Sequence, residues 1–184
     1  MTIICALHDP ETRSTWIGAD SQTTFGSMAF LHARKWFVSP DGGTAVAISG
    51  LTRLADLFRR RLDDAFHNAT AESISDLMRQ IALDDGWEME KRPAQSPDIE
   101  ANGLFATPAA AWIICSDFTV VPTPAGFLAT QGNGEYFAIG AAHALAGQPA
   151  EVVVRAAVDA AIALSIHSGG EPWIHELTAD ADRK

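Results

Sequence analysis

The sequence has few of the residues that bind metals or phosphates, with only two cysteines and three lysines in 184 residues. Cys5 and Cys115 lie in apolar, strand-like runs without the short spacing of metal ligands, so we interpret them as small core residues and expect no disulfide. Thirteen basic residues face 23 acidic ones, for a formal net charge of −10. Because affinity for nucleic acids depends on cations that neutralise phosphates, this balance predicts no nucleic-acid partner.

Long apolar runs are also absent. No 18 consecutive residues are apolar, and no basic segment followed by an apolar one opens the sequence, so we expect neither a membrane span nor a secretory signal. These absences predict a cytoplasmic protein without a membrane partner. The six histidines show no paired ligand spacing and the glycines form no phosphate-binding loop, so no metal and no cofactor is expected.

The chain is rich in apolar residues, at 47% of the sequence, and its length predicts a single domain over residues 1–184. Apolar runs bounded by turn residues predict strands at 2–7, 15–19, 35–38, 44–49, 111–116, 119–121, 127–130, 136–139 and 172–177. A period of 3.6 residues predicts helices over 51–66, after the Thr70 cap to residue 81, and from Pro149 to 164.

Residues 84–108 show neither period and contain three prolines, so we interpret them as a long connection. The order of elements is then strands, two helices, strands, at least one helix and a last strand. It predicts an α+β fold, a four-layer αββα sandwich in which two antiparallel sheets pack together and helices cover both outer faces.

Thr2 follows Met1 and opens the first predicted strand. If Met1 is removed, this threonine carries both a hydroxyl nucleophile and a free amine that can act as its base. The unperturbed pKa of such an amine is roughly 7.7 to 8.0, which suits proton transfer near neutral pH. From the Met-Thr pair alone, an ordinary threonine at the start of a strand is the simpler interpretation.

Further segments make the sequence similar to one family over nearly its whole length. They are Gly18-Ala19-Asp20-Ser21-Gln22-Thr23, Arg34-Lys35, the run 45–50 that leads into a helix, Ala138-Ile139-Gly140 and Ser168-Gly169-Gly170. Together with Thr2 they resemble the N-terminal nucleophile hydrolases, specifically proteasome beta subunits and the HslV-type peptidase.

This resemblance implies a role for each matched residue. Thr2 would be the nucleophile, and the ammonium of Lys35 would favour its deprotonated hydroxyl and lower the pKa of its amine. Asp20 would orient Lys35 and keep it charged. Ser168 would form a hydrogen bond near the threonine amine.

An oxyanion requires only a backbone N–H donor, so residue type carries little information at that position. Counting from Lys35 indicates Ala47, with Gly50 as the alternative.

The sequence also departs from the family pattern. Ala141 and Ala142 stand where the family often has a serine, and Ser165 stands where proteasome beta subunits have an aspartate. The stretch between Gly140 and the long helix is short, which predicts that one helix is reduced to a turn.

The resemblance implies a threonine-type peptidase that cleaves peptides or unfolded proteins through an acyl-enzyme, within a ring of self-associated subunits. A separate unfolding ATPase could supply substrate to such a ring. Two alternatives remain open: a catalytically silent ring or scaffold protein that retains Met1, and an amidase of the same fold that acts on small molecules.

Overall fold

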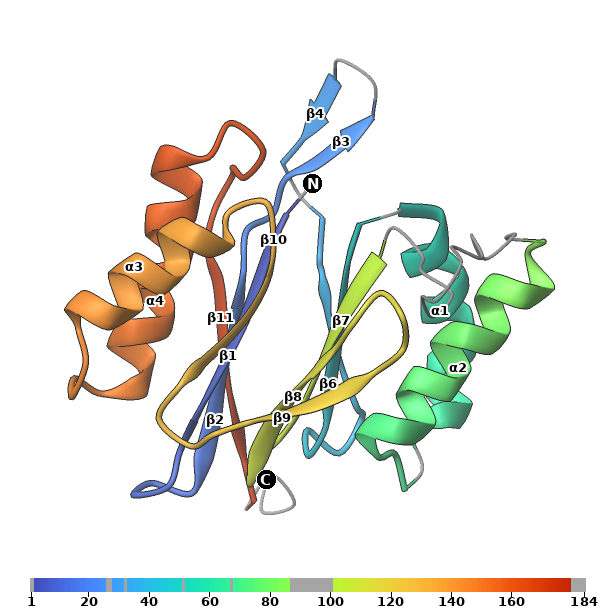
Figure 1. The fold of residues 1–184 in the computed structure, drawn as a ribbon, viewed down its shortest axis with the longest axis horizontal. Helices are drawn as coiled ribbons and strands as arrows, with labels where there is room; N and C mark the ends of the chain where they lie inside the picture. The colour runs from blue at the N-terminus through green and yellow to red at the C-terminus, as the bar shows by residue number, and fades with distance from the viewer. Residues whose placement is uncertain are drawn as a thin grey trace.

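The computed structural model describes residues 2–25, 28–31, 33–50, 52–66, 68–86 and 101–179 (Figure 1). Its strands are β1 Ile3–Asp9, β2 Ser14–Ala19, β3 Thr23–Phe25, β4 Met28–Phe30, β5 Trp36–Val38, β6 Ala45–Gly50, β7 Ala101–Thr107, β8 Ala110–Ile114, β9 Val120–Thr123, β10 Leu128–Gly132 and β11 Trp173–Thr178. Its helices are α1 Thr52–Ala65, α2 Ala71–Asp84, α3 Glu135–Ala144 and α4 Ala150–Leu164.

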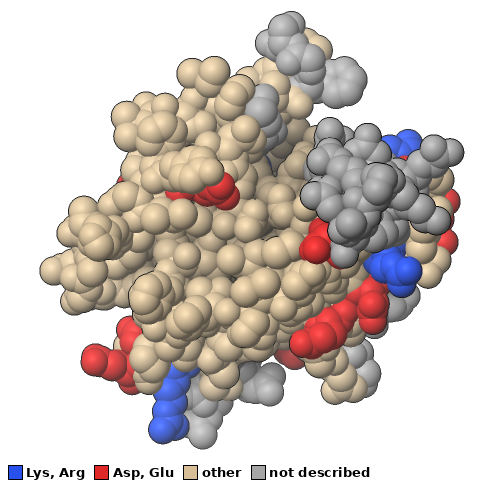
Figure 2. Space-filling model, in the orientation of Figure 1, with Lys and Arg blue, Asp and Glu red and all other residues tan. Residues whose placement is uncertain are grey.

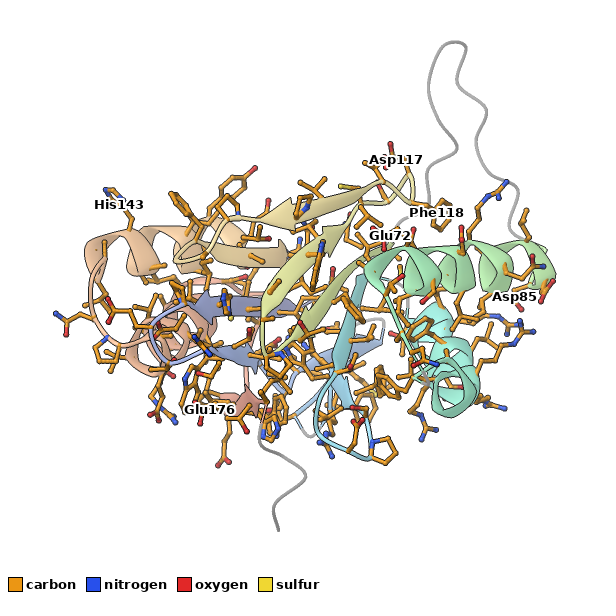
Figure 3. The ribbon with its side chains drawn as sticks, turned by 90° about the horizontal axis from the view of Figure 1, so that it is seen from below. Glu72, Asp85, Asp117, Phe118, His143 and Glu176 are labelled. Atoms are coloured by element: carbon orange, nitrogen blue, oxygen red, sulfur yellow. The ribbon has the colours of Figure 1, made fainter. Side chains whose placement is uncertain are left out.

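Two antiparallel sheets form the centre of the molecule, with strand orders β10-β1-β2-β11 and β5-β6-β7-β8-β9. Helices α3 and α4 cover the outer face of the first sheet, and α1 and α2 cover that of the second (Figure 1). The view from below shows the same succession, with His143 on α3 and Asp85 beyond α2 at opposite ends (Figure 3). The predicted αββα sandwich is confirmed.

The alternation of side chains along β1 explains why this sheet is buried on both faces. Ile3 and Cys5 belong to the apolar cluster beneath α3 and α4, whereas Ile4 and Ala6 belong to the cluster between the two sheets. Because successive side chains of a strand point to opposite faces, a strand with two buried faces is apolar throughout. Burial of Cys5 raises the pKa of its thiol to about 12, as expected for an inert core residue.

The second sheet follows the same rule. In β6, Val46 and Ile48 face the helices, while Ala45 and Ala47 face the first sheet. Helix α1 covers it with Leu54, Phe58 and Leu62, which recur at helical spacing. The turn between β8 and β9 is fixed to α2 by a hydrogen bond of 2.7 Å from Ser75 Oγ to the carbonyl of Phe118, which lies beside the start of that helix in Figure 3.

Helix α4 packs closely on β2 because Gly18 has no side chain. A Cβ atom at Gly18 would lie 2.8 Å from Val154 Cγ1 and 3.0 Å from Val158 Cγ2. The carbonyl of Gly18 also accepts a hydrogen bond of 2.9 Å from Trp36 Nε1, which ties this strand to the other sheet. Gly18 therefore sets the spacing between α4 and β2 two positions before Asp20.

The segment Tyr136–Ile139, predicted as a strand, lies in α3, and that prediction is wrong. Ala138 is fully buried in the cluster shared with β1 and α4, whereas Tyr136 and Ile139 are exposed. This burial on one side is typical of a helix. Packing against α4 outweighs the strand propensity of the aromatic run, and the segment is therefore helical. The predicted loss of a helix after Gly140 is also wrong, since α3 and α4 are separate helices.

Two strand regions were not predicted. Strand β7 lies in the segment interpreted as a connection, and Asn102 and Gly103 within it resemble a turn. A Cβ at Gly103 would lie 3.2 Å from Met78 Sδ, so the glycine reflects close helix–sheet packing. The hairpin β3–β4 is the other strand region that was not predicted. Residues 87–100 of the predicted connection lie outside the described residues.

Within the described ranges, no helix is both long and apolar enough to cross a membrane. Lysine and arginine side chains are few on the face shown in Figure 2, which is mostly uncharged.

Candidate active site

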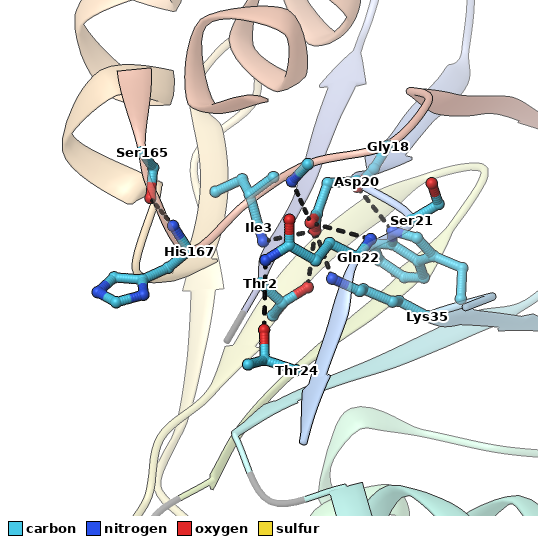
Figure 4. Close-up of polar contacts among 12 residues, drawn as sticks. Thr2, Ile3, Gly18, Asp20, Ser21, Gln22, Thr24, Lys35, Ser165 and His167 are labelled. Atoms are coloured by element: carbon cyan, nitrogen blue, oxygen red, sulfur yellow. Dashed lines mark hydrogen bonds and ion pairs between the residues drawn. The ribbon is translucent and has the colours of Figure 1, made fainter. Parts of the chain in front are cut away.

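The β1–β2 hairpin brings Thr2 and Asp20 together. The register pairs Ile4 with Ala19, and the backbone N–H of Asp20 donates to the carbonyl of Ile3 at 3.3 Å. As a result Asp20 Oδ1 accepts hydrogen bonds of 2.9 Å from both Thr2 Oγ1 and the backbone N–H of Ile3 (Figure 4). Both Thr2 and Asp20 are buried, with exposed fractions of 5% and 1%.

Lys35 reaches the same oxygen from the other sheet, where it directly precedes β5. Its Nζ donates to Asp20 Oδ1 at 2.5 Å, and the side chains of the pair are 8% and 0% exposed. Because the hydroxyl of Thr2 and the ammonium of Lys35 share one acceptor atom, they lie within two hydrogen-bond lengths of each other. Burial lowers the pKa of Lys35 from 10.5, and the nearby charge of Asp20 acts in the opposite direction.

The second carboxylate oxygen is also occupied. Asp20 Oδ2 accepts backbone hydrogen bonds from Gly169 at 3.0 Å and from Gln22 at 3.3 Å. Among the described residues, the carboxylate therefore meets five donors, four uncharged and one cationic. A buried carboxylate needs such complete hydrogen bonding and a paired cation, and here both hold it in one orientation.

The pair Gly169-Gly170 allows the loop after α4 to approach this carboxylate. A Cβ at Gly169 would overlap Oε1 of Gln22, and a Cβ at Gly170 would overlap Oγ of Ser21. Gly170 also has a φ of +78°, a conformation that favours glycine. The loop is fixed by hydrogen bonds from Ser21 N–H to the Gly169 carbonyl at 3.2 Å and from Glu171 N–H to Ser21 Oγ at 2.9 Å.

Ser168 lies in the same loop, 5% exposed, and its Oγ has no hydrogen-bond partner within the described part of the chain. It packs near the start of β1, because a Cβ at Gly134 would lie 3.1 Å from Ser168 Oγ and 3.3 Å from Ile3 Cβ. A buried hydroxyl without a partner among the described residues is uncommon, which makes Ser168 a candidate for a functional role.

Ser165 shapes the turn that carries Ser168. Its Oγ accepts from the backbone N–H of His167 at 3.2 Å (Figure 4). Its carbonyl accepts from the N–H of Ser168 at 3.2 Å. By contrast, Ala141 and Ala142 lie within α3, where Ala142 packs in the helix–sheet core.

The turn Gly132-Asn133-Gly134, rather than the Ala141 region, borders the nucleophile. Gly132 has a φ of +113°, and a Cβ there would overlap the carbonyl oxygen of Thr2. In the sequence this turn lies between the predicted strands 127–130 and 136–139, and the sequence indicates only that it separates them. The two glycines that flank Asn133 were the available signal for a close backbone approach.

Thr2 lines a cavity of about 220 Å³ that also contains Lys35, Gln22 and Gly50. Gly50 ends β6 with a φ of +109°, so the chain turns at the cavity wall. Ala47 is fully buried inside β6, paired with both neighbouring strands, and is not among the lining residues. Of the two predicted oxyanion donors, Gly50 lines the same cavity as Thr2 and Ala47 does not.

The described part of the chain thus brings together Thr2, Asp20 and Lys35, with Ser168 nearby. A hydroxyl, a cation and a fixed carboxylate beside a cavity are groups that can support nucleophilic attack on a carbonyl. The described residues contain no cluster of histidine, cysteine, aspartate and glutamate suited to a metal ion.

Comparison with solved structures supports this fold. BPH of Thiobacillus denitrificans, in complex with epoxomicin, superposes with a TM-score of 0.75 at 19% identity, over 97% of this chain and 98% of that chain. HslV of Trypanosoma brucei gives a TM-score of 0.69 at 20% identity, over 96% and 99%. The Anbu complex of Pseudomonas aeruginosa, described as a helical assembly, gives 0.74 at 13% identity, over 98% and 83%.

These similarities cover nearly the whole chain and confirm the predicted resemblance to HslV-type peptidases at the level of the fold. Neither a family model nor a curated protein matches the sequence.

Proposed function

We propose that this chain is a threonine-type peptidase in which Thr2, freed by removal of Met1, is the nucleophile. The observation that carries the proposal is the single oxygen of Asp20 that accepts from both Thr2 Oγ1 and Lys35 Nζ. This geometry places a cation next to the hydroxyl that would become an alkoxide. A proteasome-type fold beneath the site supports the same conclusion.

In the proposed reaction, Thr2 Oγ attacks the scissile carbonyl and its proton passes to the free α-amine, directly or through a water. The tetrahedral intermediate is stabilised by a backbone N–H, for which Gly50 is better placed than Ala47. The amine then gives the proton to the leaving nitrogen, the C–N bond breaks and an ester remains. Water hydrolyses the ester and restores the threonine.

Lys35 and Asp20 act on this reaction through charge. The ammonium of Lys35 stabilises negative charge on Thr2 Oγ and disfavours a second positive charge on the amine. Asp20 holds the ammonium in place and keeps it compatible with burial. Ser168 Oγ, buried and without a described partner, is the group we assign to hydrogen bonding with the freed amine.

We further propose that the chain acts as one domain and as a self-associating subunit, with peptides or unfolded proteins as substrates. The similarity to a protein described as a helical assembly supports self-association. The same proposal includes assembly of the subunits into a ring and an unfolding ATPase that would supply the ring with substrate.

Peptide hydrolysis by three forms of the protein tests the reaction. We expect cleavage of a fluorogenic peptide amide by the wild type, partial cleavage by Thr2→Ser, which keeps a hydroxyl and an amine, and none by Thr2→Ala. Equal activity of Thr2→Ala and wild type would reject Thr2 as the nucleophile. Cleavage of small amides but not of peptides would favour the amidase alternative, and an inactive chain that retains Met1 would favour the scaffold.

A further inference from the structure

The cavity beside Thr2 is locally basic, although the whole chain has a formal net charge of −10. The described residues that line it include three cationic side chains, Arg34, Lys35 and Arg59, but one anionic side chain, Asp56. Lys35 is paired with Asp20. The excess positive charge therefore belongs to the two arginines.

Asp56 neutralises Arg59 only in part, because Arg59 shares this carboxylate with Arg60, which binds it at a shorter distance. Arg60 donates to Asp56 Oδ2 from Nε at 3.1 Å and from Nη2 at 2.7 Å, whereas Arg59 Nη2 lies 3.4 Å from Oδ1. Hydrogen bonds from Arg60 are the main cause that lowers the pKa of Asp56, and Arg59 contributes less. Among the described side chains, two guanidinium groups thus share one carboxylate, and most donors of Arg59 meet no acceptor there.

Arg34 adds a second cation to the same lining. Its guanidinium lies over the ring of Trp173, 5.3 Å from the centroid, and no ion pair involves it within the described ranges. Stacking on a ring occupies the face of a guanidinium and leaves the N–H groups at its edge.

Another part of the cavity wall is apolar and is formed by Phe37, Ile48 and Ala55. A side chain with a short aliphatic stem and a carboxylate end matches both parts of this lining. The stem would pack on Phe37 and Ile48, and the carboxylate would accept hydrogen bonds from a guanidinium.

We propose that this cavity selects an acidic side chain of the substrate, with Arg59 as the main specificity-determining residue and Arg34 as a supporting cation. The inference rests on the proposed function, since it takes Thr2 as the reacting group beside the cavity. It adds the chemical class of the preferred residue and names the side chain that recognises it.

Two readouts with full-length protein test it separately from the chemistry. Binding to the Thr2→Ala protein is measured by fluorescence anisotropy, with labelled tripeptide amides Ala-Ala-Glu, Ala-Ala-Gln and Ala-Ala-Lys. Hydrolysis by the wild type is measured with the same three sequences joined to a fluorogenic amide. Because all three peptides end in an amide, they have no terminal carboxylate. The glutamate side chain is then the one carboxylate by which the glutamate peptide differs from the other two.

We expect the glutamate peptide to be preferred over the glutamine peptide about fivefold at low ionic strength in both readouts, because the ion pair would be partly exposed. The preference should fall with added salt. Arg59→Gln should reduce it to less than about twofold, and Arg59→Glu should favour the lysine peptide.

Arg61→Gln is the matched control, because it removes the same charge from the same helix. Arg61 pairs with Asp84 at 2.8 Å and does not line the cavity, so the preference should persist. Equal binding of the glutamate and glutamine peptides, no binding of either, or a preference that survives both Arg59 variants would overturn the assignment. A binding preference without hydrolysis would support the assignment and reject the proposed peptidase activity.

Discussion

Gly169 donates its backbone N–H to Asp20 Oδ2 at 3.0 Å, although 149 positions separate the two residues in the sequence. This contact joins the loop after α4 to the end of β2, and Lys35 from the other sheet meets the same carboxylate. Asp20 is thus the point at which three distant segments are held together around Thr2. Its charge should matter for both stability and activity.

Replacing Asp20 with asparagine tests this central carboxylate. The amide keeps the shape but leaves the ammonium of Lys35 buried without its counter-charge, and its NH₂ group would face backbone donors. Removing one partner of a buried pair costs about 3–5 kcal/mol, so we expect a loss of that order in the free energy of unfolding. Urea denaturation measures it.

Asp159→Asn is a suitable control, since Asp159 is exposed on α4. The control should change stability by less than about 0.5 kcal/mol, as is usual for surface positions. If Asp20→Asn behaves like Asp159→Asn, the carboxylate does not organise the site.

Ser168→Ala separates a polar role from a structural one. Because Ser168 Oγ has no partner among the described residues, its removal should leave the free energy of unfolding within about 0.5 kcal/mol of wild type. If the hydroxyl serves the freed amine of Thr2, kcat/KM should fall, by about tenfold for one lost hydrogen bond, and the acidic limb of the pH profile should move. A stable variant with an unchanged pH profile would contradict the role.

The pH dependence of hydrolysis should be bell-shaped. Activity should rise as the Thr2 amine loses its proton, because only the neutral amine can accept one. This limb should lie below the unperturbed pKa of roughly 7.7 to 8.0, since the nearby ammonium of Lys35 disfavours the charged amine. It should fall as Lys35 loses its charge, at a pH below 10.5, because burial lowers the pKa of that ammonium. Rates of kcat/KM across this range measure both limbs.

Lys35→Arg identifies the alkaline limb, since a guanidinium stays charged throughout this range. Any activity that remains in this variant should lack the fall below pH 10.5. The ionisation of Lys35 also affects stability. In the unfolded chain its ammonium loses a proton near pH 10.5, whereas in the folded chain it does so at a lower pH. Its contribution to the free energy of unfolding therefore rises with pH between the lowered value and 10.5.

Gly132→Ala tests the close approach of backbone to Thr2. Gly132 and Gly126 both have a positive φ, but a Cβ at Gly126 meets nothing within 4 Å, whereas a Cβ at Gly132 would overlap the carbonyl of Thr2. We expect Gly126→Ala to cost about 1–2 kcal/mol from φ alone, and Gly132→Ala to cost more and to reduce hydrolysis. An equal decrease in the free energy of unfolding of the two variants, measured by urea denaturation, would show that the close approach to Thr2 does not affect stability.

Much of the architecture could be predicted because its elements have faces of different burial. Helix α1 carries its apolar residues at helical spacing and β1 is apolar throughout, so each pattern had one interpretation. Helix α3 was misread because Tyr136-Phe137-Ala138-Ile139 has strand-like composition, and only packing of Ala138 on α4 reveals the helix. Strand β7 was missed because Asn102 and Gly103 resemble a turn.

The sequence predicts some of the groups in the candidate site and not others. Thr2, Asp20 and Lys35 could be proposed because their side chains carry the chemistry. The backbone N–H of Gly169 could not be proposed as a donor to Asp20, since a backbone donor leaves no mark on residue type. The Ser168-Gly169-Gly170 run and Gly132 were local signals of close backbone approach. Their physical reason, space for Ser21, Gln22 and Thr2, appears only in the folded chain.

The mass of the intact protein after exposure to epoxomicin, the compound bound in the BPH structure, tests the central claim most directly. The account predicts loss of the mass of Met1 and addition of one compound per chain, located on Thr2 by peptide mapping and absent in Thr2→Ala. A chain that keeps Met1, remains unmodified and still hydrolyses peptides would contradict it.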